Sequence, residues 1–310
     1  MVGLNFKIGG FESLKCFYHV DADGKCAAFW VKWFVGNIED EEDEYIKINY
    51  GMDFPFEKIR DGEKIYIVDY SLPVEEMKKL LDITKDITWI DHHKTAIEKY
   101  KDFEEPIRGV RYDGVAGCML TYCYLKHMTR NGEGKIKPFS NDMIKDAPYF
   151  TKLIADYDVW DFKYGNDTRF FHVAFEAENF NPDSDNWIDL MGLMNETQYI
   201  ENGKIMLKYR DSFAKEYCES KGFETEFEGY KVYAMNVGLA GSDWFKSVDD
   251  GSYDILMPFS FNGRNGTWTY SMYSKTVDVS NIAKKYGGGG HRGAAGFNMD
   301  KLIFERKGKD

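Results

Sequence analysis

Short apolar runs that alternate with helix-like segments constrain the fold of this 310-residue chain more than any other feature. Runs rich in β-branched and aromatic residues favour strands, and apolar residues at every third or fourth position favour helices. The strand candidates of the first half are residues 16–20, 45–49, 64–68, 87–90 and 107–111, and helices are expected at 27–35, from Pro73 onward and at 114–127. Strands that alternate with helices indicate an α/β domain with a mostly parallel sheet.

The last third of the chain has a different pattern. A long helix is predicted over residues 199–222, strands over 230–237, 253–260 and 267–274, and a short helix over 279–286. A long helix with a polar face between two zones of different pattern is typical of a linker. We therefore predict a first domain over residues 1–195, a linker helix over 196–222 and a smaller α/β domain over 223–310.

The composition is that of an ordinary globular protein, with 43% hydrophobic and 30% charged residues. There are 40 Lys and Arg against 52 Asp and Glu, which gives a net charge of −12. Residues 223–310 hold 11 basic and 11 acidic side chains, so the whole excess lies in the first 222 residues. This balance argues against binding of long duplex nucleic acid through a broad basic face. The acidic run from Glu39 to Glu44 predicts a solvated loop, and a gating role for it is left open.

The cysteines and the apolar segments indicate the cellular compartment in which the protein is expected. Five cysteines without CxxC spacing favour reduced thiols. No apolar stretch reaches the ~20 residues that a bilayer requires, and the first ten residues lack the pattern of a secretory signal. We therefore expect a cytoplasmic protein with no membrane partner.

Potential metal ligands follow three of the predicted strands. They are His19, Asp21 and Asp23 after the first, Asp69 after the third, and Asp91, His92 and His93 after the fourth. A single aspartate at a strand end is often only a turn residue. Three sets at the same position favour a binding site, because parallel α/β sheets place ligands at the carboxyl ends of their strands.

Carboxylate and imidazole together suit Mn²⁺, Fe²⁺, Co²⁺ or Zn²⁺, and the absence of cysteine from these sets argues against a structural zinc site. An excess of aspartate can bridge two cations, which would then clamp the attacking and leaving oxygens of a phosphoryl transfer. Asp156 and Asp158 follow another apolar run, and each could instead cap a helix. His127 and His172 lack such a setting and are interpreted as structural or surface residues.

A glycine-rich segment near the end of the chain is the other unusual motif. Four consecutive glycines, 287–290, precede His291 and Arg292. Such a run suits a close approach of the backbone to a ligand, where N–H groups bind an anion and arginine adds a bidentate contact. The alternative is a flexible turn.

These motifs together resemble the DHH superfamily of phosphoesterases, in the subgroup that carries a DHHA1 domain. The residues that carry the resemblance are His19, Asp21, Asp23 and Gly24; Val68 and Asp69; Asp91, His92 and His93; Ile154, Ala155 and Asp156; and residues 288–296. They occur in the order of the family over positions 17–297. His19 lies two residues before Asp21, and this spacing is similar to that of RecJ-like and archaeal-type members.

The resemblance implies a DHH domain and a DHHA1 domain with a cleft between them, and two divalent metal ions, typically Mn²⁺. The metal ligands that it implies are His19, Asp21, Asp23, Asp69, His92 and Asp156, with Asp158 as a rival for the last position. It implies that His93 contacts the scissile phosphate and that Asp91 orients a histidine. It assigns substrate binding to Gly288, Gly289, Gly290, His291 and Arg292.

A compact member of this kind is similar to the nano-RNases. The expected activity is metal-dependent hydrolysis of short single-stranded oligonucleotides from an end, by a water that the two metals activate. The alternatives are a cyclic or linear dinucleotide, 3′-phosphoadenosine 5′-phosphate or single-stranded DNA as substrate, or a nucleotide-binding protein without turnover. The choice between RNA and DNA and between a monomer and a homodimer is left open.

Overall fold

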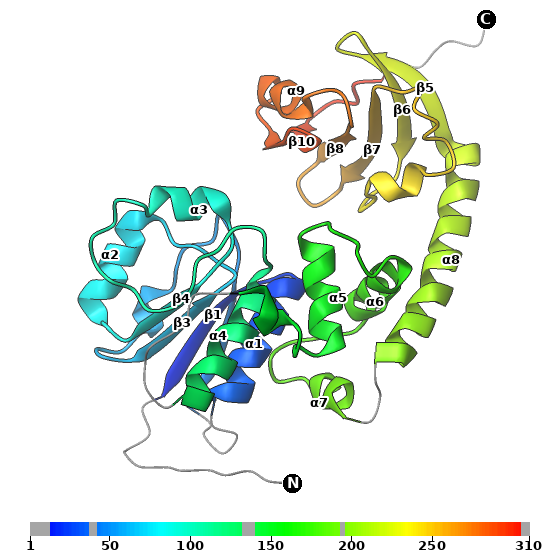
Figure 1. Ribbon diagram of the computed structural model, residues 1–310. Helices are drawn as coiled ribbons and strands as arrows, with labels where there is room; N and C mark the ends of the chain where they lie inside the picture. The colour runs from blue at the N-terminus through cyan, green and yellow to red at the C-terminus, as the bar shows by residue number, and fades with distance from the viewer. Residues whose placement is uncertain (1–12, 37–41, 132–139, 193–195, 305–310) are drawn as a thin grey trace, which may run out of the picture. The chain divides into compact units, whose positions relative to one another are not determined.

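The computed structural model describes residues 13–36, 42–131, 140–192 and 196–304 (Figure 1). The chain divides into two compact units, Met1–Ile205 and Met206–Asp310. The long helix α8, Glu196–Lys221, crosses this division. The finer separation into a catalytic domain, a linker and a substrate-binding domain stays a prediction. Half of the predicted acidic run, residues 39–41, lies outside the described residues.

A parallel sheet of four strands is the centre of the first unit. Its order is β2-β1-β3-β4, with β1 at Leu14–His19, β2 at Glu44–Ile48, β3 at Lys64–Val68 and β4 at Ile87–Ile90. The prediction of an α/β fold with a parallel sheet is confirmed. The segment 107–111, expected as a strand, forms only two isolated bridges, Thr88 with Arg108 and Asp91 with Arg111.

Alternate residues of these strands are buried on opposite faces, which explains the apolar runs of the sequence. On one face Cys16, Tyr18 and Val68 pack with α1, Ala22–Phe34, and α4, Gly117–Asn131. On the other face Phe17 and Ile67 pack with α2, Val74–Ile83, which α3, Lys94–Lys99, follows along the chain. Both faces of the sheet are therefore covered, and its strand ends remain the place for a site.

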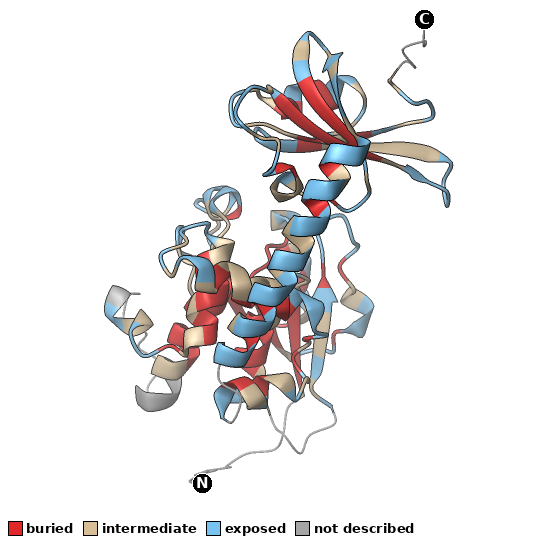
Figure 2. Cartoon of the chain, turned by 90° about the vertical axis from the view of Figure 1, so that its right-hand side faces the viewer, coloured by how far each residue is buried: buried red, intermediate tan, exposed pale blue. Residues whose placement is uncertain are grey.

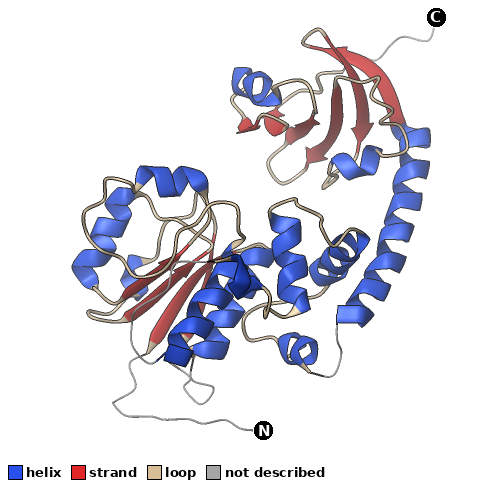
Figure 3. Ribbon diagram, in the orientation of Figure 1, coloured by secondary structure: helices blue, strands red, loops and turns tan. Residues whose placement is uncertain are grey.

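Three further helices of this unit are not predicted from the sequence. They are α5 at Tyr149–Asp158, α6 at Asn166–Ala177 and α7 at Asn186–Met191, and short 3₁₀ segments lie at Phe56–Lys58 (η1) and Asn141–Ile144 (η2) (Figure 3). An aromatic cluster joins them to α1: Trp30 stacks on Phe150, and Phe29 stacks on Trp187. This packing holds the first turn of α5 against α1.

The second unit contains a mixed sheet of six strands in the order β5-β6-β7-β8-β10-β9. The strands are β5 at Gly222–Phe227, β6 at Tyr230–Asn236, β7 at Ile255–Asn262, β8 at Thr267–Tyr273, β9 at Gly289–His291 and β10 at Ala294–Met299. The helix α9, Val279–Lys285, packs on one face, and the 3₁₀ segment η3, Ser242–Phe245, packs on part of the other. Figure 2 shows that the inner strands of this sheet are buried, whereas α8 is exposed along much of its surface.

None of the described helices is long and apolar enough to cross a membrane. The five cysteines are free and buried.

Candidate metal centre

The carboxyl ends of β1, β3 and β4 bring the predicted ligands to one edge of the parallel sheet. His19 is the last residue of β1, Asp69 directly follows β3, and His92 lies two residues after β4. Asp21 caps the helix α1, where its Oδ1 accepts a hydrogen bond from the Gly24 amide at 2.9 Å. The clustering expected from strand-end positions is therefore present in the structure.

One group of potential ligands consists of His19, Asp21 and Asp69. His19 Nδ1 lies 2.6 Å from Asp21 Oδ2 and 3.7 Å from Asp69 Oδ2. Burial alone lowers the pKa of His19, but the hydrogen bonds and charges of these two carboxylates outweigh it and raise the pKa to about 10. Without a metal ion, a proton on this imidazole therefore offsets part of the negative charge.

A second group consists of Asp23, His92 and Asp158. His92 Nε2 lies 3.7 Å from Asp23 Oδ2 and 3.4 Å from Asp158 Oδ2. Burial, followed by the charge of Asp23, raises the pKa of the Asp158 carboxyl to about 7. Two carboxylates thus face one imidazole nitrogen, which is a suitable donor set for a cation.

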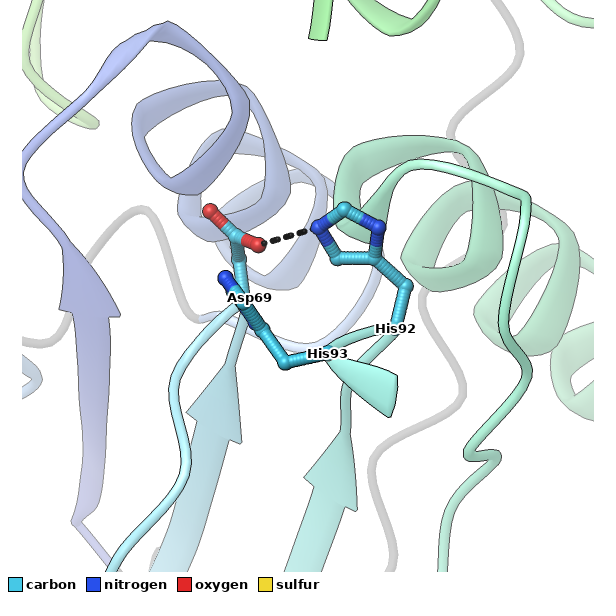
Figure 4. Close-up of side chains that lie close together, drawn as sticks. All are labelled: Asp69, His92 and His93. Carbon is cyan, nitrogen blue, oxygen red and sulfur yellow. Dashed lines mark ion pairs between the residues drawn. The ribbon is translucent and has the colours of Figure 1, made fainter. Parts of the chain in front are cut away.

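Asp69 lies between the two groups. Its Oδ2 is the oxygen near His19, whereas its Oδ1 lies 3.2 Å from His92 Nε2 (Figure 4). The side chain is 1% exposed, and neither of its oxygens has a hydrogen-bond partner among the described residues. Burial, together with nearby carboxylates, raises its pKa to about 8. A buried carboxylate left without donors is costly unless a cation or a proton satisfies it.

The backbone holds Asp69 in an unusual conformation. Its φ is 53°, in the left-handed region that a residue with a Cβ seldom adopts. Its amide donates to the Ile90 carbonyl at 2.9 Å, which continues the pairing of β3 with β4 beyond the last strand residue. Strain of this kind is found at functional sites, where surrounding structure maintains it.

The amino terminus of α4 holds Asp23. The amides of Gly117 and Cys118 donate to its two carboxylate oxygens at 2.6 and 2.9 Å. A Cβ at position 117 would lie 2.8 Å from Asp69 Cβ and 3.0 Å from Asp23 Oδ2, so only glycine fits there. Sequence reasoning missed Gly117, although the glycines at the start of this predicted helix were a visible signal.

His93 is held by Asp91, a fully buried carboxylate. Asp91 Oδ1 lies 2.7 Å from His93 Nδ1 and accepts the His92 amide at 2.8 Å, and the Ser71 hydroxyl donates to its other oxygen. The hydrogen bond that the His93 ring donates to Asp91 raises the pKa of His93 to about 9. Asp91 therefore orients a histidine, and that histidine is His93.

Asp156, predicted as the last metal ligand, is not part of the cluster. Its carboxylate accepts the amides of Lys163 at 3.0 Å and Tyr164 at 3.3 Å, and the Thr168 hydroxyl donates to it. These bonds hold the connection from α5 to α6 and use both oxygens. Asp158, the rival weighed from the sequence, is the aspartate that faces His92, so it replaces Asp156 as the candidate ligand.

The end of β2 contributes two residues that sequence reasoning did not single out. Asn49 Oδ1 lies 3.2 Å from His19 Nε2, the ring nitrogen that faces away from Asp21. The Tyr50 ring lies 5.6 Å from the His19 ring and 5.9 Å from that of His93. An amide and a tyrosine after a strand have no specific signal in one sequence, because both are common in turns and on surfaces.

The glycine-rich motif lies in the second unit, and its residues belong to a different part of the chain from the cluster. Gly289–His291 form the edge strand β9, while Arg292 and Gly293 connect it to β10. A Cβ at Gly288 would lie 2.1 Å from the Gly296 carbonyl, and Gly290 has a φ of 138°. These glycines therefore allow close strand packing, and His291 and Arg292 are exposed.

The remaining histidines lie away from the cluster. The His172 ring stacks on that of Tyr157, with centroids 3.4 Å apart. His127 lies in α4, near its carboxyl end. Neither residue belongs to a group of potential ligands among the described residues.

The donor set fits divalent cations. It combines four aspartates with two or three imidazoles, which suits Mn²⁺-type ions better than a purely oxygen or purely thiolate site. The oxygens of Asp69 and the Oδ2 of Asp158 contact only imidazole rings and accept no hydrogen bond among the described residues, which supports this conclusion.

Comparisons with known proteins agree with this architecture, although no protein-family model matches the chain. An uncharacterized protein of Acanthamoeba polyphaga mimivirus is 24% identical over 261 residues, which are 80% of this chain and 55% of the viral protein. Oligoribonuclease NrnB of Bacillus subtilis is 23% identical over 315 residues, covering 93% of this chain and 73% of NrnB. The pGpG-specific phosphodiesterase PggH of Vibrio cholerae shares the fold, with a TM-score of 0.50, 12% identity and 93% coverage of both chains.

The chain thus combines a parallel sheet that has His and Asp residues at its strand ends with a mixed sheet that has a glycine-rich edge strand. The similarity to oligoribonuclease NrnB and the fold shared with PggH support the resemblance of this chain to the DHH/DHHA1 superfamily of phosphoesterases. The resemblance inferred from the ordered motifs is thereby confirmed.

Proposed function

We propose that this protein hydrolyses phosphodiester bonds of short single-stranded oligonucleotides from an end, with two divalent cations, Mn²⁺ by preference. The observation that carries the proposal is the position of Asp69, whose two oxygens face two separate groups of ligands. A carboxylate of this kind suits a pair of cations that share one ligand.

Each cation would have its own ligands besides Asp69. His19 and Asp21 would hold one, and Asp23, His92 and Asp158 the other. When bound, such a pair supplies a water of lowered pKa and charge stabilisation for the phosphate oxygens. The helix α4 supports this arrangement, because its first amides fix Asp23 at the required place.

His93 would contact the phosphate. Its Nδ1 faces Asp91, so Nε2 is the nitrogen that can donate to a ligand. Asp91 raises the pKa of His93 in the metal-free protein, and the ring would donate a hydrogen bond to a phosphate oxygen. Asp91 would act as a positioning residue.

The second unit would bind another part of the substrate. His291 is the last residue of β9 and Arg292 follows it; both are exposed, beside glycines that would let a ligand approach the backbone. Arginine binds phosphate oxygens in a bidentate manner. We assign substrate binding to Gly288, Gly289, Gly290, His291 and Arg292 on this basis.

The class of substrate rests on the relatives and on charge. NrnB is an oligoribonuclease, and PggH acts on the linear dinucleotide pGpG. A net charge of −12 disfavours long polyanions, whereas two cations and a few donors are sufficient for the phosphates of a short oligonucleotide. The five free, buried cysteines fit a reducing compartment such as the cytoplasm.

An end-labelled RNA ladder of two to about ten nucleotides, incubated with Mn²⁺, tests this function. Product release should occur, fall with increasing length and be absent in His92→Ala, because His92 lies nearest to Asp69 and Asp158. Lys78→Ala, which removes an exposed lysine of α2, is the control variant and should retain the wild-type rate.

The outcomes separate the possible substrates. Turnover of pGpG alone would replace the oligonucleotide by a linear dinucleotide. Turnover of single-stranded DNA but not RNA would identify a deoxyribonuclease. Binding of nucleotides with no hydrolysis of RNA, DNA, linear or cyclic dinucleotides or 3′-phosphoadenosine 5′-phosphate would overturn the proposed activity.

A further inference from the structure

The Tyr50 side chain, in the turn after β2, is an exposed ring beside the metal centre and has no role in the proposed hydrolysis. It is 51% exposed. Its centroid lies 5.6 Å from that of the His19 ring and 5.9 Å from that of the His93 ring. His19 belongs to a group of potential metal ligands, and His93 is the residue assigned to the phosphate. The ring therefore lies where the nucleoside of a bound phosphate would lie.

A tight turn fixes the backbone of Tyr50. The Met52 amide donates to the Asn49 carbonyl at 3.1 Å, and Gly51 has a φ of 87°, in the left-handed region that glycine adopts without strain. The Asn49 side chain joins this turn to the metal centre, because its Oδ1 accepts the Tyr50 amide at 2.8 Å and lies 3.2 Å from His19 Nε2. The position of Tyr50 is thereby tied to that of His19.

The buried side chain of Tyr70 supports the ring of Tyr50. The two centroids are 4.9 Å apart and the rings are inclined by 32°, so Tyr70 covers part of one face. Tyr70 directly follows Asp69, belongs to the core beneath the sheet and accepts the Trp89 indole N–H on its carbonyl at 3.0 Å. Because Tyr70 is fixed in this way, the Tyr50 ring is held in place while much of its side chain stays exposed.

An exposed ring in this position suits a nucleic-acid base. Every base has an aromatic face, and stacking on tyrosine is a common means by which proteins bind single strands without strict sequence preference. Contacts with phosphate alone do not distinguish a nucleotide from another phosphate ester, whereas a ring beside the phosphate does. A single exposed aromatic residue elsewhere on a surface carries no such meaning, but Tyr50 lies beside two histidines of the candidate site.

We propose that the Tyr50 ring stacks on the base of the nucleotide whose phosphate lies at the metal centre, and that it makes the site selective for nucleotides over simple phosphate esters. This inference rests on the proposed function for its class of ligand. Tyr50 contacts the substrate and holds no cation. It should therefore affect the affinity for ligands that carry a base and leave the affinity for Mn²⁺ unchanged.

Binding of a dinucleotide that cannot be hydrolysed tests the inference without turnover. The ligand is a diribonucleotide in which a methylene replaces the bridging 5′ oxygen, and its counterpart has the same backbone without bases. Isothermal titration of the full chain in Mn²⁺ measures both. Tyr50→Ala should weaken binding of the dinucleotide roughly ten-fold, because the base loses its stacking partner, and should leave binding of the base-free ligand unchanged. Tyr50→Phe keeps the ring and should recover most of the lost affinity.

Trp33→Ala is the matched control, because Trp33 is 50% exposed but lies in the last turn of α1, whereas the first turn of α1 lies at the metal centre. It should bind both ligands as the wild type does. Titration with Mn²⁺ alone should give the same affinity in Tyr50→Ala as in the wild type.

Four results would overturn the inference. They are wild-type affinity for the dinucleotide in Tyr50→Ala, an equal loss for both ligands, a loss of Mn²⁺ binding in that variant, and a wild-type protein that does not bind the dinucleotide.

The test separates this inference from the proposed function. A loss in Tyr50→Ala that depends on the base, in a protein that hydrolyses no oligonucleotide, would keep the stacking role and reject the activity. Unchanged binding of the dinucleotide in Tyr50→Ala, in a protein that hydrolyses the RNA ladder, would reject the stacking role and keep the activity.

Discussion

Asp69 and Asp23 show how single residues carry the chemistry of the site. Asp69 is buried, conformationally strained and without hydrogen-bond donors, whereas Asp23 is buried and accepts two amides. Burial, together with nearby carboxylates, raises the pKa of each to about 8. Both are therefore destabilising as bare carboxylates, and a cation would relieve that cost.

Asp156 and Asp158 should respond to substitution in opposite ways. Asp158→Asn should reduce activity by at least about 100-fold with little change in stability. Loss of a direct metal ligand should lower activity at least as much as loss of a residue that only orients a ligand. Asp156→Asn should instead lower the free energy of unfolding by about 2–4 kcal/mol, since its carboxylate holds two amides and the Thr168 hydroxyl.

Manganese affinity and thermal unfolding, measured on both variants, check this prediction. The folded fraction of Asp156→Asn should retain Mn²⁺ binding close to that of the wild type. A loss of metal binding in Asp156→Asn together with normal binding in Asp158→Asn would restore the assignment made from the sequence.

The metal-free protein should become less stable as pH rises from about 6.5 to about 8. The pKa values of Asp23 and Asp69 are about 8 in the folded protein, against an ordinary value of 3.8. The folded state therefore binds more protons than the unfolded state across that interval of pH. His19 and His93, with pKa values of about 10 and 9 against 6.5 ordinarily, act with the same sign. The free energy of unfolding therefore falls with rising pH.

Calorimetry in EDTA at several pH values measures this effect. The melting temperature should fall over the interval, and saturating Mn²⁺ should remove or reverse the trend, because the cation replaces the protons. A melting temperature in EDTA that rises from pH 6.5 to 8 would contradict the account.

At the scale of elements, the strand ends were predictable and the helix ends were not. The four strands of the parallel sheet are continuous apolar runs, since both faces of the sheet are covered. The sequence placed the start of α1 at residue 27 instead of Ala22, because the Asp21 cap was interpreted only as a potential ligand. The choice between Asp156 and Asp158 depends on the last turn of α5, and element boundaries are the least certain part of a sequence-based prediction.

Gly117 is the first residue of α4 and lies against Asp23 and Asp69, so its substitution tests whether α4 positions these carboxylates. Gly117→Ala should weaken Mn²⁺ binding by more than about ten-fold, because the new methyl would push against Asp69 and Asp23. The free energy of unfolding should change by less than about 1 kcal/mol, since alanine improves helix propensity while it crowds the site.

Gly192→Ala, where a Cβ would make only an ordinary contact at 3.4 Å, is the control and should bind Mn²⁺ normally. Isothermal titration with Mn²⁺ measures both variants. Normal affinity in Gly117→Ala would show that α4 does not fix the position of these carboxylates.

At the scale of the whole molecule, charge and chemistry are divided between the two units. The negative excess lies within residues 1–222, which include every candidate metal ligand, whereas residues 223–310 are balanced and hold the glycine-rich strand. The sequence indicated this division because the His and Asp sets occur only in the first part, and the run of four glycines only in the second. Asn49 and Tyr50 gave no comparable signal, because their contacts with His19 arise only when β1 and β2 are aligned.

The central claim is that Asp69 joins two cation sites, and electron paramagnetic resonance during a Mn²⁺ titration of the metal-free protein tests it most directly. The account predicts two bound ions per chain with an exchange-coupled spectrum, and loss of the coupling in Asp69→Asn. A wild-type protein that binds a single uncoupled ion, or a coupled pair that persists in Asp69→Asn, would contradict it.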